Sequence, residues 1–409
     1  MRLDALIFGG GAAGLWLLDR LSRDGHHVLL LEAESLGAGE TVASHGIIHS
    51  HVRCSPAGLL TKPVKGARDL QQIWRDALDG RSTPDLSHTK LRAECCYHWE
   101  TPRFQPRLAN TDEPQEARTT AEIVAVEDRP EALKGVTGSV TRLAEQIISP
   151  RSLLEDFATQ YADRILRIDA KHGLQFDLDS PGDVAAVRLT SMADDSVLEL
   201  RPRQVIFTAG KGNVRLRRMI GLSTEVMQRR TMQLVLARGG LPVLNGACLE
   251  GTRSRFTITS EKDTHGRCVW QIGGQLAEDG VKLDATTLTE KAKAELSAAL
   301  PGIALHDIEW STYTVDRAEG TTPHGNRPES IQVLCAGNVT TGWPTQLVLA
   351  PALAHEIASR ATSPYYATKF DTTPFADWPR PEIATLPWDD VKRSWWKLTH
   401  AENKQRRAA

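Results

Sequence analysis

The chain has 409 residues, of which 41% are hydrophobic and 24% charged, and its formal net charge at pH 7 is −2. This length allows two or three domains with an ample core, and the near-neutral charge argues against nucleic acid as the main partner. No apolar run approaches the roughly 20 residues of a membrane-spanning helix.

Cysteine usage and the start of the chain bear on the compartment. The six cysteines include no Cys-x-x-Cys pair, so the sequence predicts neither a disulfide framework nor a bound metal. A buried strand is expected from about Leu3, which leaves no room for a cleavable export signal. We therefore expect a cytoplasmic protein with reduced thiols.

A glycine-rich turn follows this first strand. Gly9, Gly11 and Gly14 have the spacing Gly-x-Gly-x-x-Gly and lie between an apolar strand and a helical apolar stripe. The first glycine permits a tight turn, the second lets a pyrophosphate approach the backbone, and the third lets the helix pack close to the strand. The free N–H groups at the start of such a helix favour an anion.

The next strand ends in an acidic residue. The run "GHHVLLLEAE" is typical of a buried parallel strand, and Glu32 lies about 20 residues beyond the glycines. A carboxylate there can accept hydrogen bonds from both hydroxyls of an adenosine ribose, which favours a free 2′-hydroxyl over a 2′-phosphate. The combined pattern predicts a dinucleotide site rather than a purely structural βαβ unit.

Helices and short strands alternate through the middle of the chain. Helices are expected at about 65–78 and at 149–162, where Ser149 would be the N-cap and Pro150 the first helical residue. The stretch of about 81–112 is expected to be irregular or lid-like. Strands are expected at 164–169, at 173–179 and from 204 into a second glycine turn.

Later elements suggest a second sheet. From about 227 to 319, short β-like runs predict an antiparallel sheet interrupted by one amphipathic helix at 287–300. A closing strand at 331–339 and a helix beginning near Gln346 follow. We expect an α/β fold in which a discontinuous Rossmann-like domain carries an inserted mixed or antiparallel β-sheet domain. The predicted limits are 1–80, 145–215 and 325–365 for the nucleotide domain, 81–144 and 216–324 for the substrate domain, and 366–409 for a C-terminal tail.

Four blocks spanning nearly the whole chain resemble the FAD-dependent oxidoreductases of the D-amino-acid oxidase type. That family includes glycine and sarcosine oxidases, glycerol-3-phosphate dehydrogenase and L-2-hydroxyglutarate dehydrogenase. The blocks are the opening glycine turn with its acid, "GAGETVASHGIIHS", "IISPRSLLEDFA" with "VIFTAGKGN", and "VLCAGNVTTGWPTQLVLAPALAHEIA". The second block is one residue short of the commonest form, and the others depart from it at Lys211, Asn213, Asn338 and Trp343.

The resemblance implies FAD as the cofactor and a fold that binds it non-covalently. Some relatives attach their flavin through His or Cys, for which His45 or Cys335 would be the candidates, but we do not favour attachment. The residues expected at the cofactor are Gly9, Gly11, Ala12, Ala13, Gly14, Glu32, Ala33, Thr41, Ser44, His45, Gly46, Ala209, Gly210, Gly337, Asn338, Gly342, Trp343 and Thr345.

The closing block also makes physical sense by itself. A strand ending at Gly337 and Asn338 would bring an amide to the carboxyl edge of the sheet, where ligands of α/β proteins bind. The helix from about Gln346 would point its positive end at the same crevice. A plain terminal βα unit is the alternative.

His49 is the first candidate for catalysis. The resemblance places it at the end of the loop beside the flavin, and oxidation of a C–OH or C–NH bond needs a base for the heteroatom proton. An imidazole is suited to that role at neutral pH. The alternatives are a structural histidine or a flavin contact without proton transfer. His45 is expected to contact the cofactor and His51 to lie at the surface.

Arg317 is the second candidate. It lies near the position at which many family members place an arginine that binds a substrate carboxylate, and a guanidinium can do so with two parallel bonds. Its neighbour Asp316 could instead be its ion-pair partner. Tyr313 is a further catalytic candidate for the same pocket.

These features predict an oxidoreductase that transfers a hydride from a small amino acid, amine or 2-hydroxy acid to flavin N5, with oxygen or a quinone as electron acceptor. A flavin monooxygenase or halogenase is the alternative enzyme, although such enzymes usually carry Gly-Asp where this chain has Gly337-Asn338. A flavoprotein-fold escort or binding protein is the non-enzymatic alternative.

The tail contains four of the ten tryptophans and ends in basic residues. We expect its aromatic side chains to fill grooves on the body of the protein. Peripheral contact with a membrane is the alternative, but the amphipathic spacing is poor.

Overall fold

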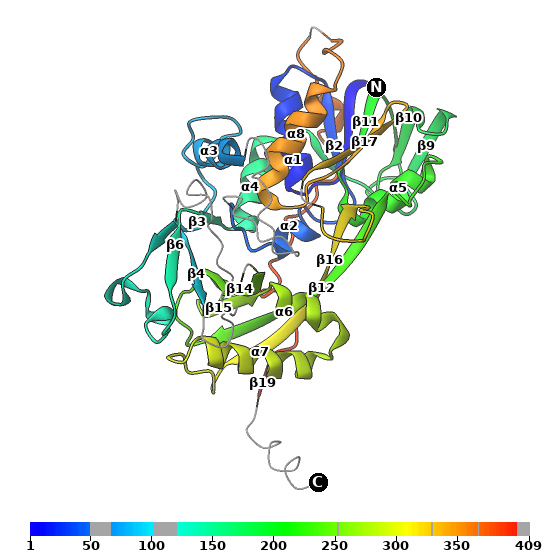
Figure 1. Cartoon of the computed structure of the whole chain (residues 1–409). Coiled ribbons are helices and arrows are strands. Elements are labelled where there is room, and N and C mark those ends of the chain that lie inside the picture. Colours follow the sequence, from blue (N-terminus) through cyan, green and yellow to red (C-terminus); the bar gives the residue numbers. More distant parts are fainter. Residues whose placement is uncertain (50–66, 101–120, 252, 329, 367, 399–409) are drawn as a thin grey trace.

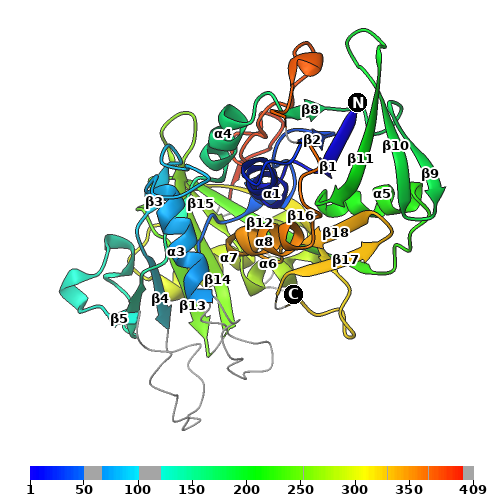
Figure 2. The same cartoon turned by 90° about the horizontal axis from the view of Figure 1, so that it is seen from above.

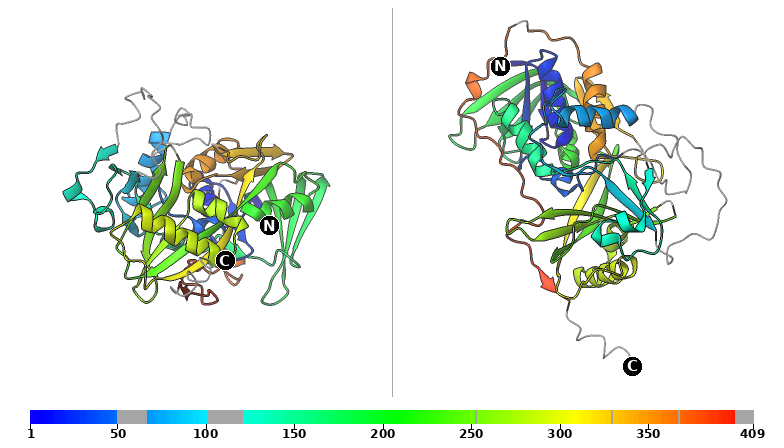
Figure 3. Two further views of the ribbon diagram at one scale, coloured as in Figure 1. Left: turned by 60° about the horizontal axis from the view of Figure 1, so that its bottom comes forward. Right: turned by 90° about the vertical axis from the view of Figure 1, so that its left-hand side faces the viewer.

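The computed structural model describes residues 1–49, 67–100, 121–251, 253–328, 330–366 and 368–398. Two large sheets lie one above the other in Figure 1, and the tail runs past both of them in the right-hand view of Figure 3. His51, expected at the surface, lies outside the described residues.

The upper sheet has eight strands, in the order β17-β18-β11-β1-β2-β8, with β10 and β9 continuing antiparallel from β11. The neighbours from β18 to β8 are all parallel, whereas β17 is antiparallel to β18. Its strands are β1 (Arg2–Phe8), β2 (Val28–Glu32), β8 (Ile165–Arg167), β9 (Leu174–Ser180), β10 (Asp183–Thr190), β11 (Val197–Phe207), β17 (Gln332–Ala336) and β18 (Val339–Trp343).

Both faces of the parallel part are covered, which explains the continuous apolar runs of β1 and β2. The helices are α1 (Ala12–Arg23), α2 (Glu40–Ala43), α3 (Ala67–Leu78), α4 (Pro150–Gln160), α5 (Asn213–Met219), α6 (Gln275–Asp279), α7 (Ala285–Ala299) and α8 (Ala350–Ser359). Of these, α1 and α8 lie side by side on one face, as Figures 1 and 2 show, and share a core with α3 and α4. The strands β9 and β10 and the helix α5 pack on the other face.

The lower sheet has nine strands, in the order β19-β16-β12-β15-β14-β13-β4-β6-β5. The helix α7 covers its outer face. Its strands are β4 (Cys96–Glu100), β5 (Ala121–Ile123), β6 (Val140–Leu143), β12 (Met227–Gly239), β13 (Gly246–Glu250), β14 (Arg253–Lys262), β15 (Cys268–Ile272), β16 (Glu309–Gly320) and β19 (Trp396–Lys397). The predicted α/β class is confirmed, while the predicted domain limits stay a prediction.

The prediction that 81–112 is irregular is wrong for part of its length. β4 pairs in parallel with β13 and antiparallel with β6, so it lies inside the lower sheet. A small two-stranded ladder also joins β3 (Leu91–Ala93) to β7 (Ile147–Ile148). The local sequence misleads because the partners of β4 lie more than 40 residues away along the chain.

The described part of the tail packs on the body, as expected. Trp388 is buried, and the indole N–H of Trp378 donates to the carbonyl of Arg167 at 2.8 Å. Farther along, β19 pairs with β16 at the edge of the lower sheet. Among the described residues, no helix is long and apolar enough to cross a membrane.

Candidate functional site

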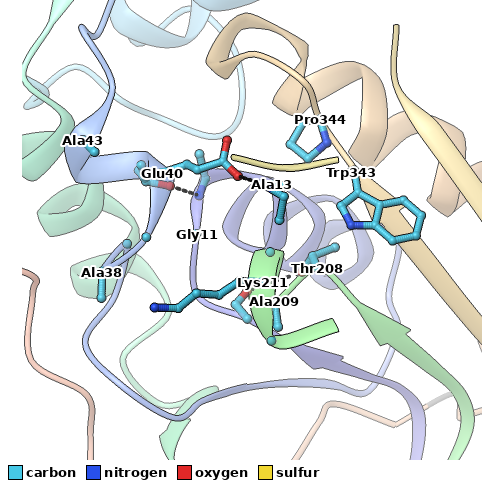
Figure 4. Close-up of a pocket in the computed structure, with 18 of the residues that line it drawn as sticks. Gly11, Ala13, Ala38, Glu40, Ala43, Thr208, Ala209, Lys211, Trp343 and Pro344 are labelled. Carbon is cyan, nitrogen blue, oxygen red and sulfur yellow. Dashed lines mark hydrogen bonds between the residues drawn. The ribbon is translucent and has the colours of Figure 1, made fainter. Parts of the chain in front are cut away.

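A cleft of about 350 Å³ lies at the carboxyl ends of β1, β11 and β18 and is closed from below by β12 and β16. Figure 4 shows residues from separate parts of the chain around it: Gly11 and Ala13 at the start of α1, Ala209 and Lys211 after β11, and Trp343 at the end of β18. In parallel α/β sheets ligands bind at this edge.

The glycine turn has the geometry that its spacing predicts. Gly9 has φ +109°, and a Cβ there would lie 2.5 Å from the Cα of Ala209. A Cβ on Gly14 would overlap the carbonyl oxygen of Gly9, so α1 can approach β1 this closely only without a side chain. Gly11 is the N-cap of α1 and has no side chain that could cap the helix, and the Ala12 N–H donates to the Thr41 hydroxyl at 3.1 Å.

Glu32 lies at one end of the cleft. Its carboxylate accepts hydrogen bonds from the backbone N–H of Gly10 at 2.6 Å and of Glu34 at 2.7 Å. Burial raises the pKa of Glu32, and these bonds oppose the rise. Ala33, Leu174 and other apolar residues line the cleft together with Glu32.

The lining fits the expected FAD. The first turn of α1 presents a helix N-terminus whose N-cap residue, Gly11, has no side chain in the way, which suits a pyrophosphate. At the other end, the indole N–H of Trp343 and the hydroxyl of Thr345 are buried and have no hydrogen-bond partner in the described residues. Both residues line the cleft at the carboxyl end of β18.

Most of the predicted cofactor residues meet in this cleft. Gly14 lies behind it and acts through helix packing, while two others, treated next, lie elsewhere. Those that line the cleft are Gly9, Gly11, Ala12, Ala13, Glu32, Ala33, Thr41, Ser44, His45, Gly46, Ala209, Gly210, Gly342, Trp343 and Thr345.

The structure corrects the placement of Gly337 and Asn338. Because β17 is antiparallel to β18, these two residues form the turn at the start of β18 instead of its carboxyl end. The Asn338 side chain bonds the backbone N–H and carbonyl of Val184, each at 2.9 Å, and neither residue lines the cleft. Asn338 therefore does not distinguish an oxidase from a monooxygenase, and the carboxyl edge is formed by Gly342 and Trp343.

Cys335 is also misplaced as a candidate for flavin attachment. It is an exposed residue of β17, close to the Thr340 hydroxyl and to Arg360, and it does not line the cleft. In the described part of the chain, no group of three or more His, Cys, Asp or Glu residues could hold a metal ion.

His45 belongs to a hydrogen-bonded chain under the cleft. Its Nδ1 lies 2.9 Å from the Thr259 hydroxyl, which approaches the oxygen of the Gln271 amide at 3.5 Å. The amide nitrogen of Gln271 donates to the carbonyl of Ala43 at 2.8 Å. Because the Gln271 nitrogen donates to Ala43, its oxygen is the atom that accepts from the Thr259 hydroxyl. The hydroxyl proton of Thr259 is then used for Gln271, so Nδ1 of His45 donates to the Thr259 oxygen. Burial, aided by nearby Arg92 and Arg317, lowers the pKa of His45 to about 3.

This low pKa makes stability depend on pH. An unfolded histidine takes up a proton near pH 6.5 whereas folded His45 does so near 3, so the unfolded state gains protons first and stability falls as the pH drops through this window. When the pH falls from 7.5 to 5.5, the wild type should lose about 1.4 kcal/mol of unfolding free energy through His45. His45→Gln lacks this loss, so its stability relative to the wild type should rise by that amount. Urea unfolding at both pH values measures it.

The test uses the difference in unfolding free energy between His45→Gln and the wild type. The pH dependence of the wild type alone does not suffice, because Glu40 changes stability with pH in the opposite direction. Burial raises the pKa of Glu40 to about 7, against the bond from the Ala318 N–H and the charge of Arg317, so its contribution falls as the pH rises. Subtraction of the wild type cancels Glu40. An equal difference at both pH values would refute the linkage to His45.

His49 is held at the mouth of the cleft by backbone pairing. Ile47 and Ile147 form an antiparallel bridge, which brings the segment before β7 alongside the histidine. The Nδ1 atom of His49 lies 3.4 Å from the Glu145 carboxylate, and the side chain of His49 is 46% exposed while that of Glu145 is 5% exposed.

Arg317 lines the same cleft, whereas its neighbour Asp316 pairs elsewhere. The Asp316 carboxylate accepts from the Thr231 hydroxyl at 2.7 Å and lies 3.5 Å from Arg229. Within the described residues no carboxylate oxygen lies within 4.0 Å of the Arg317 guanidinium. Asp316 is therefore not its ion-pair partner.

Tyr313 does not belong to the site. It precedes Arg317 by four residues on β16, which is about 13 Å along a strand. Its hydroxyl is 2.6 Å from the amide nitrogen of Gln271, behind Ala43, and it does not line the cleft. Burial raises its pKa, so it is not a base near neutral pH.

Several charged lining residues were missed as site residues, and Glu40, Lys211 and Arg215 are among them. Glu40 lies inside the quoted glycine loop, but nothing in its local sequence shows that β16 buries it. Lys211 and Arg215 follow the second glycine turn, and their positive charge beside a predicted phosphate site is a signal that could have identified them.

Comparisons with known proteins agree with this geometry. The family model "DAO: FAD dependent oxidoreductase" matches residues 4–360. A probable FAD-dependent oxidoreductase of Pseudomonas aeruginosa is 33% identical over 391 residues, covering 94% of this chain and 97% of the relative. The crystal structure of an FAD-dependent oxidoreductase from Pseudomonas aeruginosa has a TM-score of 0.77 at 31% identity, covering 95% of this chain and 98% of that one.

More distant structures share the fold. Glycine oxidase from Geobacillus kaustophilus has a TM-score of 0.56 at 15% identity, covering 91% of this chain and 98% of that one. L-Proline dehydrogenase from P. horikoshii has a TM-score of 0.59 at 13% identity, with coverage of 91% and 98%. With the family model matched along most of its length and a cleft that fits the cofactor, this chain belongs to the DAO family of FAD-dependent oxidoreductases.

Proposed function

We propose that this oxidoreductase removes two electrons from a small amino acid, a related amine or a 2-hydroxy acid. The observation that carries the proposal is Arg317, a guanidinium with no carboxylate partner in the described residues, in the same cleft as His49. Both side chains lie near one neighbour, since Arg317 and His49 are each among the groups that lower the pKa of His45. A carboxylate-bearing substrate would therefore meet its anchor and its base in one small space.

The chain supplies binding and proton transfer. Arg317 binds the substrate carboxylate with two parallel N–H bonds and fixes the Cα at the flavin end of the cleft. His49 takes one proton from the substrate ammonium or hydroxyl group, so that loss of the Cα hydride leaves an iminium ion from an amine or a ketone from a hydroxy acid. Bound FAD would supply the hydride acceptor, and its two electrons would then go to oxygen or a quinone.

An anaerobic screen tests the proposal. Amino acids, N-methyl amines and 2-hydroxy acids are mixed with the yellow holoprotein, and we expect the flavin absorbance near 450 nm (an approximate flavin value,) to bleach with at least one small carboxylate substrate. Readmission of oxygen, or addition of a quinone analogue, then identifies the acceptor. A holoprotein that no such compound bleaches, or one that hydroxylates a substrate while consuming NADPH, would contradict the proposal.

Arg317→Lys extends the screen. Lysine keeps the charge but loses the two-bond geometry, so KM for the carboxylate substrate is expected to rise about 10- to 100-fold with a smaller change in kcat. The matched control is the same variant with an amine that lacks the carboxylate, for which KM should stay near its wild-type value. Equal effects on both compounds would show that Arg317 does not bind the carboxylate.

A further inference from the structure

A buried acid lies directly behind the proposed base. Glu145 is 4% exposed, and its Oε2 lies 3.4 Å from Nδ1 of His49. A carboxylate removed from water is stable only beside groups that can donate to it. His49 is such a donor, and its ring reaches the cleft from the same position.

Backbone pairing fixes the two residues relative to one another. The N–H of Ile48 donates to the carbonyl of Gln146 at 2.8 Å, and the N–H of Ile148 donates to the carbonyl of Gly46 at 3.0 Å. Glu145 and His49 immediately flank this ladder. Their contact therefore does not depend on two mobile surface side chains finding each other.

Three other ionisable groups of this region carry little charge near neutral pH, whereas Arg92, which acts on His45 and on Cys96, is a cation. His45 comes from the preceding loop, and burial lowers its pKa to about 3. On β4, burial lowers the pKa of His98 and raises that of the Cys96 thiol well above its usual value, with Glu145 acting on both groups. Among the described residues, Glu145 is the carboxylate that lies within 4.0 Å of the His49 ring.

We propose that Glu145 is a positioning residue that holds the Nδ1–H of His49 and so leaves Nε2 of the ring facing the cleft as proton acceptor. The inference rests on the proposed function of His49 as the base. A carboxylate in this role fixes the tautomer of the imidazole and stabilises the imidazolium formed when the substrate proton arrives, without itself taking up the proton. The observed 3.4 Å contact can tighten when substrate binds.

Nuclear magnetic resonance of the 15N-histidine-labelled holoprotein tests the inference without a substrate. The His49 signals are those missing from His49→Gln. We expect the neutral ring of wild-type His49 to carry its proton on Nδ1. In Glu145→Gln the pH midpoint of its protonation should move down, because an opposite charge has been lost. The matched control is Glu94→Gln, an exposed carboxylate 3.1 Å from the Gln146 amide, which should leave the midpoint in place.

An Nε2–H tautomer in the wild type would overturn the inference, as would an equal midpoint in both glutamate variants. If Glu145→Gln does not fold, the tautomer of His49 in the wild type still tests the inference. With a substrate from the screen, Glu145→Gln should lower kcat more than it changes KM. Should His49→Gln retain the wild-type rate while the tautomer and midpoint behave as expected, the proposed base fails and the pairing with Glu145 stands.

Discussion

Replacement of His49 by glutamine is expected to slow flavin reduction by about 10²- to 10⁴-fold, roughly 3 to 5 kcal/mol of barrier, while the protein stays yellow. Glutamine keeps a hydrogen-bonding side chain but cannot take the substrate proton. The wild-type rate should rise with pH across the imidazole range, and the variant should lack that limb. Anaerobic stopped-flow measurement of flavin bleaching gives both quantities.

The control for this experiment is His355→Gln, which removes an exposed imidazole on α8 near Arg20, outside the cleft. It should leave rate and pH profile unchanged. If His49→Gln instead loses its flavin, His49 belongs to the cofactor-binding site. If His49→Gln keeps both the wild-type rate and its rise with pH, the base lies elsewhere. Glu40 is then the next candidate, because it lines the same cleft and burial raises its pKa to about 7.

Gly14→Ala is expected to yield protein with little or no bound flavin. The added methyl group would overlap the carbonyl oxygen of Gly9 and lie 2.8 Å from the Thr208 hydroxyl, so α1 must move away from the turn that it shares with the cofactor. Overpacking of this kind costs about 1–3 kcal/mol, and the displaced helix no longer presents its N-terminus to the pyrophosphate. The ratio of flavin to protein absorbance measures the loss.

Gly240→Ala is the matched control for that substitution. A Cβ at Gly240 meets no atom within 4 Å, and the residue lies outside the cleft. Its flavin content should equal that of the wild type. Full flavin content in Gly14→Ala would show that the close approach of α1 to Gly9 is not needed for cofactor binding.

The sequence predicts best where neighbours in space are also close along the chain. The strand, glycine turn, helix and acid between Arg2 and Glu32 form one contiguous unit, and each glycine has a steric reason visible in its spacing. The helix after Ser149 is similarly local, since Pro150 marks its first turn. These elements form as expected.

Prediction fails where long-range pairing decides the outcome. An apolar run such as β17 does not reveal whether it runs parallel or antiparallel, and its direction places Asn338 at the far end of β18. Tyr313 and Arg317 lie on the same strand, β16. Arg317 lines the cleft whereas Tyr313 does not, and the local sequence does not show which part of the strand lies at the cleft. The contact of Glu145 with His49 spans 96 residues and has no local signal.

The discontinuity of the upper sheet has a consequence for biosynthesis. Its central strand β1 is made first, but its neighbour β11 follows only at residue 197, and β18, on the other side of β11, only at residue 339. The tail then holds the loop beside Glu32 from outside, through the backbone pairing of Leu36 with Ile383. Such non-local closure is slow. The dinucleotide can therefore bind only after nearly the whole chain has left the ribosome. FAD cannot stabilise the chain earlier in its synthesis.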